Sequence, residues 1–167
     1  IDVEKLHFRF ASKLKAKTDD RYAYELGRQF ELAGKLEDSF IYYQIEIEKA
    51  KSISAHTYQQ QLLEHLNTLQ LKVEQKIKVN FQLCEVLLTI DALNECLDCI
   101  DDTSILISSK KDKQELEIIK GVCLNKLGRI DEGLVLLKEN IEIISFSSDV
   151  PNSLHRRRHN ASWQSTD

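Results

Sequence analysis

The sequence predicts an all-α protein, and three observations support that prediction. The chain holds only 5 glycines and 1 proline in 167 residues, where an average soluble protein of this length would hold about 20 of the two together. Sheets, hairpins and glycine-rich phosphate loops consume these residues, so sandwiches, barrels and doubly wound nucleotide folds are disfavoured. Apolar residues recur instead at helical spacing. The five glycines cluster in two places, each with a seven-residue spacing.

The first helices are expected over residues 2–17 and within residues 20–53. Both ranges carry an amphipathic stripe, and in the second Gly34 suits the left-handed residue that ends a helix. A second apolar run follows Gly34 at once, so the two helices must fold back on each other as an antiparallel hairpin. Gly27, in mid-helix, is expected to let the second helix come close.

The stretch from residue 55 to 79 has an apolar stripe but contains no helix breaker. It is either one long helix or two helices whose joint no residue marks. A coiled-coil strand is the weaker alternative, because the stripe is shorter than three heptads. We therefore expect an additional packed helix near residues 55–75.

Two further hairpins are expected at residues 77–110 and 114–147. The first breaks near Asp91, and the second turns at Gly128. The helical domain would then span residues 1–146 with about 7 to 8 helices. Residues 147–167 are polar and basic, and we expect them to form a flexible C-terminal tail.

Charge and composition exclude several classes of protein. The formal net charge of −4 gives no general attraction to nucleic acid. No apolar run has the length of a membrane span, and no signal peptide opens the chain. Four cysteines without secreted-domain spacing suggest reduced thiols, hence the cytoplasm or the nucleus. Because residue 1 is Ile and methionine is absent, we expect a segment of a longer protein.

The pattern of residues 20–53 resembles a tetratricopeptide repeat, a helix–turn–helix unit of 34 residues. The residues that carry the resemblance are Leu26, Gly27, Phe30, Gly34, Ser39 and Tyr43. The hairpin at 77–110 is similar through Leu83, Cys84, Leu87, Cys96 and Ile100, and the hairpin at 114–147 through Gly121, Leu124, Gly128, Gly133 and Leu137. The three hairpins start 57 and 37 residues apart, which makes the middle of the chain irregular.

The resemblance implies an α-solenoid of antiparallel helix hairpins whose first helices line a concave groove for a partner peptide or helix. Helix geometry then gives the groove candidates Arg21, Tyr24, Arg28, Lys78, Phe81, Glu85, Glu115, Ile118, Val122 and Asn125. The alternative is that Tyr24, Phe81 and Ile118 simply pack against adjacent helices. A clamp for carboxylates, known in this family, is disfavoured because Glu115 would repel that ligand.

No constellation in the sequence predicts catalysis or a cofactor. Cys96 and Cys99 have the spacing of half a zinc site, but the other cysteines, Cys84 and Cys123, stand alone. We interpret these thiols as packing residues and predict no metal site, with metal binding or redox chemistry as the alternatives. The histidines are scattered. The acidic residues Glu46, Glu48, Glu95, Asp98, Asp101 and Asp102 form either a solvated helix face or a site for a basic ligand.

The tail holds one cluster of candidate residues: Arg156, Arg157, Arg158, Ser162 and Trp163. A solvated end is the simplest interpretation. The alternatives are an anchor in which Trp163 fills a pocket of a partner, a kinase site at Ser162, and, in a secreted protein, glycosylation at Asn160.

These observations predict a non-catalytic interaction module that holds a protein or peptide partner, with no membrane and no nucleic acid. The alternative function is a regulatory or sensor segment of a larger ATPase or kinase. A helical enzyme with a composite site is the third and least supported hypothesis.

Overall fold

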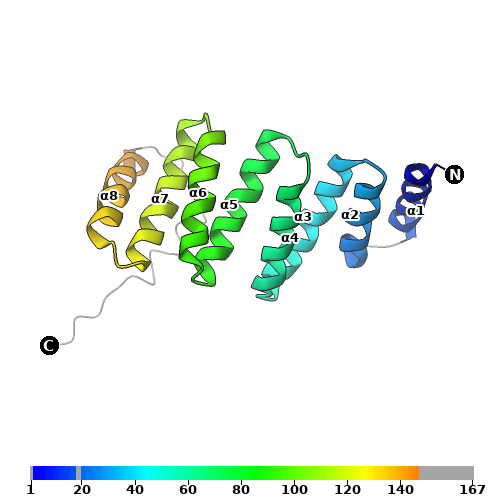
Figure 1. The fold of residues 1–167 in the computed structure, drawn as a ribbon, viewed down its shortest axis with the longest axis horizontal. Helices are drawn as coiled ribbons and strands as arrows, with labels where there is room; N and C mark the ends of the chain where they lie inside the picture. The colour runs from blue at the N-terminus through cyan, green and yellow to red at the C-terminus, as the bar shows by residue number, and fades with distance from the viewer. Residues whose placement is uncertain (1, 18–19, 147–167) are drawn as a thin grey trace. The chain divides into compact units, whose positions relative to one another are not determined.

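The computed structural model describes residues 2–17 and 20–146, and within them the chain is all-α (Figure 1). This part of the chain forms eight α-helices and one 3-10 turn, with no strand. The helices are α1 (Val3–Lys17), α2 (Ala23–Leu32), α3 (Leu36–Ser52), α4 (His56–Thr68), α5 (Val73–Thr89), α6 (Leu93–Leu106), α7 (Lys110–Lys126) and α8 (Ile130–Phe146), with the 3-10 turn at Asp20–Tyr22.

Four of the joints between helices share one backbone design. The residues Gly34, Ser54, Asp91 and Gly128 each have a φ between 56° and 82°, and each is the middle one of three connecting residues. At Gly34 the next amide, Lys35 N–H, donates to Phe30 O at 2.8 Å, and the other three joints repeat this bond at 2.9 Å. The bond satisfies a helix-end carbonyl and turns the chain back. The expected left-handed conformation of Gly34 and the expected breaks near Asp91 and at Gly128 are therefore confirmed.

The joint that the sequence could not locate lies at residues 69–72. Leu69 and Lys72 have extended backbone, with ψ angles of 156° and 153°, so the apolar stripe across 55–79 belongs to the two helices α4 and α5. The helix expected near 55–75 is thus α4, at 56–68. The two later hairpins, expected from 77 and 114, each begin four residues earlier, at Val73 and Lys110.

The first residues of the helices repeat with a regular spacing that was not expected from the sequence. The helices α3, α5 and α7 begin at 36, 73 and 110, and α4, α6 and α8 begin at 56, 93 and 130, so 37 residues separate each start from the next in its series. Positions 37 apart also share their surroundings. Five sets are buried throughout: Tyr42, Val79 and Leu116; Ile47, Cys84 and Gly121; Ala50, Leu87 and Leu124; Gln59, Cys96 and Gly133; Leu66, Thr103 and Asn140. The middle of the chain is therefore regular when counted from α3.

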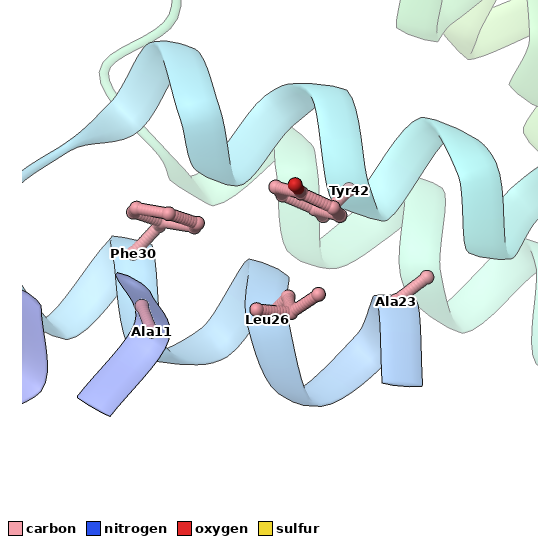
Figure 2. Packing of buried hydrophobic residues seen from close by; sticks show 5 residues of the cluster. All are labelled: Ala11, Ala23, Leu26, Phe30 and Tyr42. Carbon is pink, nitrogen blue, oxygen red and sulfur yellow. The ribbon is translucent and has the colours of Figure 1, made fainter. Parts of the chain in front are cut away.

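The contacts within the chain define two compact units, Ile1–Leu116 and Glu117–Asp167. The core of the first unit includes a cluster in which α1, α2 and α3 meet (Figure 2). Phe30 stacks on Tyr42 with ring centroids 5.6 Å apart, and Phe8 approaches Phe30 edge-on at 6.4 Å. The buried members of the cluster are Ala11, Ala23, Leu26, Phe30 and Tyr42.

Within the second unit, two glycines allow a close crossing of α7 and α8. A Cβ atom on Gly121 would lie 3.0 Å from the carbonyl oxygen of Gly133, and one on Gly133 would lie 2.7 Å from that of Gly121. Both distances are too short for a larger residue. The side chain of Asn140 donates to Glu117 at 2.9 Å across the same pair.

Within the first unit, alternate helices are neighbours. Glu31 of α2 contacts His65 of α4 at 2.9 Å. Gln44 of α3 bonds Gln82 of α5 at 2.9 Å. The helices α4 and α6 border one pocket. One side of this unit is therefore formed by α2, α4 and α6, and another by α3 and α5.

Candidate functional site

Two of the predicted groove residues, Tyr24 and Arg28, lie in a pocket of about 320 Å³ between α2 and α4. Tyr43 of α3 forms its floor and is only 1% exposed, whereas Tyr24 is 43% exposed at the rim. We call this site the tyrosine pocket. The residues that line it are Tyr24, Arg28, Glu31, Leu32, Tyr43, Tyr58, Gln61, Leu62 and His65.

A hydrogen-bonded triad holds the floor of the tyrosine pocket. The Tyr43 hydroxyl donates to Glu31 Oε2 at 2.8 Å, and His65 Nε2 donates to the same oxygen at 2.9 Å. The His65 ring meets the Tyr43 ring edge-on, with centroids 5.4 Å apart. Burial, and then the Glu31 carboxylate, raise the pKa of Tyr43 well above its usual range, so Tyr43 stays a neutral donor.

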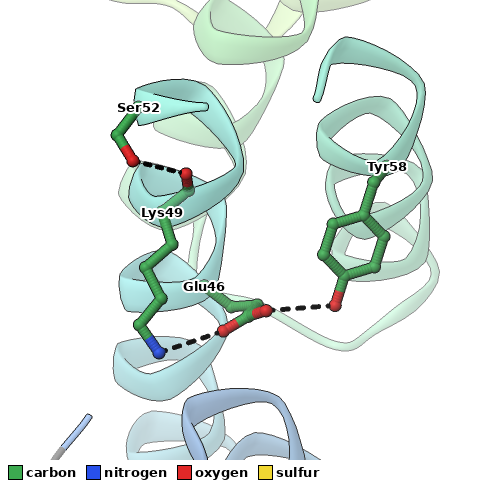
Figure 3. A network of polar contacts seen from close by, with 4 residues as sticks. All are labelled: Glu46, Lys49, Ser52 and Tyr58. Carbon is green, nitrogen blue, oxygen red and sulfur yellow. Dashed lines mark hydrogen bonds and ion pairs between the residues drawn. The ribbon is translucent and has the colours of Figure 1, made fainter. Parts of the chain in front are cut away.

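Tyr58 forms the opposite rim of the tyrosine pocket. Its hydroxyl donates to Glu46 Oε1 at 3.3 Å, and the other oxygen of Glu46 pairs with Lys49 Nζ at 3.2 Å (Figure 3). Burial and Glu46 raise the pKa of Tyr58 to about 12. The network ties α4 to α3 and fixes an aromatic ring that is 37% exposed. Two aromatic rims and the exposed Arg28 are typical components of protein-binding surfaces.

A second pocket, of about 280 Å³, lies on the other side of α4 and reaches α6. Four carboxylates line it, and none of the described residues that line it is a lysine, arginine or histidine. We call this site the acidic pocket. Its lining residues are Gln60, Glu64, Asn67, Asn80, Leu83, Leu87, Glu95, Asp98, Cys99 and Asp102. Unneutralised carboxylates in a groove attract cationic groups.

The predicted groove residues of α5 lie on the side formed by α3 and α5, away from the tyrosine pocket. Lys78 Nζ lies 5.9 Å from the centre of the Phe40 ring of α3 and lines a pocket of about 490 Å³ with α3 residues. Glu85 contacts Lys51 of α3 at 3.5 Å. The structure therefore does not bring Tyr24 and Arg28 together with Lys78 and Glu85.

The physical reason is the helix α4. Successive helices of the first unit lie on different sides. Because two helices, α3 and α4, separate α2 from α5 in the chain, α2 and α5 lie on different sides as well. The repeat pattern aligned α5 with α2 and left α4 as an additional helix, so residues of α2 and α5 were expected on one face. On these two sides, α2 instead contacts α4 through Glu31 and His65, and α5 contacts α3 through Gln82 and Gln44.

The remaining groove candidates are placed as follows. Arg21 is exposed in the 3-10 turn, Phe81 is half-buried, and Glu115 is exposed. Partial desolvation, and then the carboxylates of Asp112 and Glu85, raise the pKa of Glu115. In the second unit Ile118, Val122 and Asn125 are half-buried, and the Asn125 side chain packs against Gly133. The tail candidates Arg156, Arg157, Arg158, Ser162 and Trp163 lie outside the described residues.

Several residues of these pockets were not expected from the sequence. Glu31 and His65 are 34 positions apart, and only the three-dimensional fold brings them into contact. Tyr43 was expected only as part of the repeat pattern, and Tyr58 belongs to the apolar stripe of residues 55–79, to which no binding role was assigned. The acidic residues Glu95, Asp98 and Asp102 were noted, but their convergence with Glu64 of α4 has no signal in the spacing.

Searches among known proteins add no relative to these observations. No family model, no curated protein and no solved structure matches the chain. Among the described residues, no group of three or more histidine, cysteine, aspartate or glutamate side chains is arranged to hold a metal ion. None of the described helices has the length and apolar character needed to span a bilayer.

Proposed function

We propose that this chain is a non-catalytic interaction module, built from tetratricopeptide-like helix pairs, that holds a peptide or helix of a partner protein. The proposed surface runs along α2, α4 and α6 through the tyrosine pocket and the acidic pocket. Because α4 and α6 are the second helices of the 37-residue pairs, this surface differs from the groove of first helices that the resemblance implies. The observation that carries the proposal is that these two pockets lie back to back on α4, which contributes side chains to both.

The helix spacing supports the repeat part of this proposal. The 37-residue period joins α3 with α4, α5 with α6, and α7 with α8, each pair turned by a left-handed residue. A buried residue follows that turn five positions later in each pair, at Gln59, Cys96 and Gly133. Such periods mark helical arrays, in which each pair packs against its neighbours and exposes a row of surface pockets.

The two pockets differ in chemistry, and this difference suggests the type of partner. Arg28, Tyr24 and Tyr58 offer one cation and two aromatic rims, whereas the four carboxylates of the acidic pocket favour a cation. A partner segment that crosses α4 would place lysine or arginine over Asp98 and Asp102, and an apolar or acidic residue over Tyr24 and Arg28. This surface fits a basic peptide.

A library of short peptides of varied charge, screened against the purified chain, tests the proposal. We expect peptides that combine lysine or arginine with an acidic residue to bind, and their binding to be lost in Asp98→Lys/Asp102→Lys. Binding of the same peptides should be weakened in Arg28→Glu, because the new carboxylate repels their acidic residue. Matched controls carry the same kinds of charge reversal on the side formed by α3 and α5: Glu48→Lys and Lys78→Glu. Equal effects of the control and test variants, with helicity preserved, would refute the proposed surface.

A further inference from the structure

The helix α1 leaves a row of apolar side chains exposed. Ala11 is buried in the core cluster (Figure 2), whereas Val3, Leu6 and Phe10 are 58%, 58% and 51% exposed. Their spacing of three and four residues places the three along one side of the helix. We call this row the α1 stripe. Contiguous exposed apolar residues of this kind mark a surface that another element covers.

The helix pairs show what covers the same register elsewhere in the first unit. The helices α1 and α2 begin 33 residues before α3 and α4, so Phe10 corresponds to Tyr43, and 37 residues later the same place holds Asn80. Tyr43 is buried against Gly27 of α2, and Asn80 is buried and accepts a hydrogen bond from Asn67 of α4 at 2.8 Å. In α3 and α5 this register therefore packs against the second helix of the preceding pair.

The α1 stripe is exposed where its counterparts on α3 are buried. Leu6 and Phe10 take the places of Ser39 and Tyr43, which are 0% and 1% exposed. Within the described part of one chain, no helix covers the α1 stripe. The second helix of another pair, if its outer side is also exposed, would cover the stripe by the same packing that joins α2 with α3.

The helix α8 exposes the matching side of a second helix. Leu134 is the fifth residue of α8, as Gly27 is of α2, and it is 41% exposed. Ile130, one turn earlier, is 57% exposed, and Val135 is 54% exposed. We call Ile130, Leu134 and Val135 the α8 stripe. At the position where α2 receives the Tyr43 ring, α8 thus presents apolar side chains to solvent.

The two helices carry opposite charge. The helix α1 holds five lysines or arginines and one glutamate, whereas α8 holds four carboxylates and one lysine. A contact of α1 with α1, or of α8 with α8, would bring like charges together, but a contact of α1 with α8 pairs opposite charges. The charges therefore favour a contact between the different helices of two copies.

We propose that the chain associates head to tail, with the α1 stripe of one copy packed on the α8 stripe of the next copy. Such a contact uses a different surface on each side, so a dimer keeps one free stripe of each kind and further copies can add. The contact is independent of the proposed binding of a basic peptide, because neither stripe lines the tyrosine pocket or the acidic pocket. A contact of one helix with one helix is small, which predicts weak association.

Sedimentation velocity of the full chain at increasing concentration tests the proposal. We expect species larger than a dimer, because the free stripes of a dimer bind further copies. A chain that stays monomeric up to about 0.5 mM, where even a Kd near 1 mM would be visible, would overturn the proposal. A chain that stops at the dimer would overturn it as well, since that result indicates a contact between identical surfaces.

Two variants and their mixture identify the surfaces. Phe10→Glu and Leu134→Glu each place a carboxylate in one stripe, and each variant alone should stay monomeric. An equimolar mixture should form a dimer and nothing larger, because the intact α8 stripe of the first variant binds the intact α1 stripe of the second. A mixture that stays monomeric, with helicity preserved by circular dichroism, would overturn the proposal.

A matched control carries the same kind of substitution away from both stripes. Ile105→Glu, at a residue of α6 that is 82% exposed, should associate like the wild type. Dissociation of this control to the same extent as Phe10→Glu would contradict the assignment of the stripes. If a first variant fails to fold, Val3→Glu and Ile130→Glu test the same two stripes at more exposed positions.

Discussion

The ring of Tyr43 lies against the bare backbone of Gly27. A Cβ atom at Gly27 would be 3.1 Å from Cγ and Cδ1 of Tyr43, which is shorter than ordinary van der Waals contact. The ring has little room to move, because it also meets Tyr24 and His65 edge-on and its hydroxyl is bonded to Glu31. Gly27 thus allows α2 and α3 to approach, as the sequence analysis expected.

We predict that Gly27→Ala destabilises the protein. Alanine in a helix would gain about 1 kcal/mol in propensity, but crowding in a packed core costs about 1 to 3 kcal/mol. The expected net change is a free energy of unfolding lower by about 1 kcal/mol, measured by urea denaturation. A stabilised variant would show that the Tyr43 ring can shift without cost.

The left-handed joints give a second prediction. Ser54 has a φ of 56° and Gly34 a φ of 66°, and a side chain in this conformation costs about 1 kcal/mol relative to glycine. Ser54→Gly should therefore raise the free energy of unfolding by about 0.5 to 1 kcal/mol. Gly34→Ser should lower it by a similar amount, because no atom within 4 Å of a Cβ there could compensate. The same sign for both variants would contradict this account.

The triad at the floor of the tyrosine pocket predicts how stability depends on alkaline pH. The folded pKa of Tyr43 lies above the value of an unfolded tyrosine, about 10. The stabilisation that the neutral Tyr43 hydroxyl gives to the folded state is therefore fully present below pH 10. As the pH rises further, the free energy of unfolding falls by up to about 1.4 kcal/mol per pH unit. Tyr58, with its pKa at about 12, adds a smaller loss of the same sign.

Tyr43→Phe separates this effect from general alkaline unfolding. The variant should be about 1 kcal/mol less stable at neutral pH, because the bond to Glu31 is lost. Above pH 10 its stability should fall less steeply than that of the wild type. Urea denaturation across this pH range measures both quantities, and parallel curves for the two proteins would show that Tyr43 does not titrate in this way.

The acidic pocket predicts a conflict between stability and binding. Asp98 and Asp102 lie four residues apart on α6 and both line the pocket, and like charges at this spacing destabilise a helix by about 0.2 to 0.5 kcal/mol. Asp98→Asn should therefore make the free chain slightly more stable and weaken its affinity for basic peptides. Thermal denaturation and peptide titration of the same sample check the two effects. A loss of stability in this variant would mean that Asp98 is held by a structural partner.

Some of the fold could be predicted from the sequence because its signals are local. The scarcity of glycine and proline indicated helices, and Gly34 and Gly128 marked two joints. The joint between residues 53 and 55 was expected from the apolar runs on either side, but the left-handed conformation of Ser54 was not, because serine seldom adopts a positive φ. The joint at 69–72 was missed because it contains neither glycine nor proline. The 37-residue period was hidden because one buried position holds Ile47, Cys84 and Gly121 in turn.

The candidate site was less predictable, because it depends on which helices are neighbours. Helix geometry identified Tyr24 and Arg28 as outward-facing residues, and the structure places both in one pocket. Their contacts with α4 could not be derived from spacing. Only the fold shows that Glu31 reaches His65, and that Lys78 faces α3 instead.

Binding of a basic partner segment on the side formed by α2, α4 and α6 is the proposal from which the other functional predictions follow. The most direct measurement is the affinity of one selected basic peptide, by fluorescence anisotropy, for the wild type, for Asp98→Lys/Asp102→Lys, and for the control Glu48→Lys. We expect the double variant to lose at least about 1.4 kcal/mol of binding free energy, a tenfold weaker Kd, while the control binds like the wild type. Unchanged binding by a folded double variant would contradict the proposal.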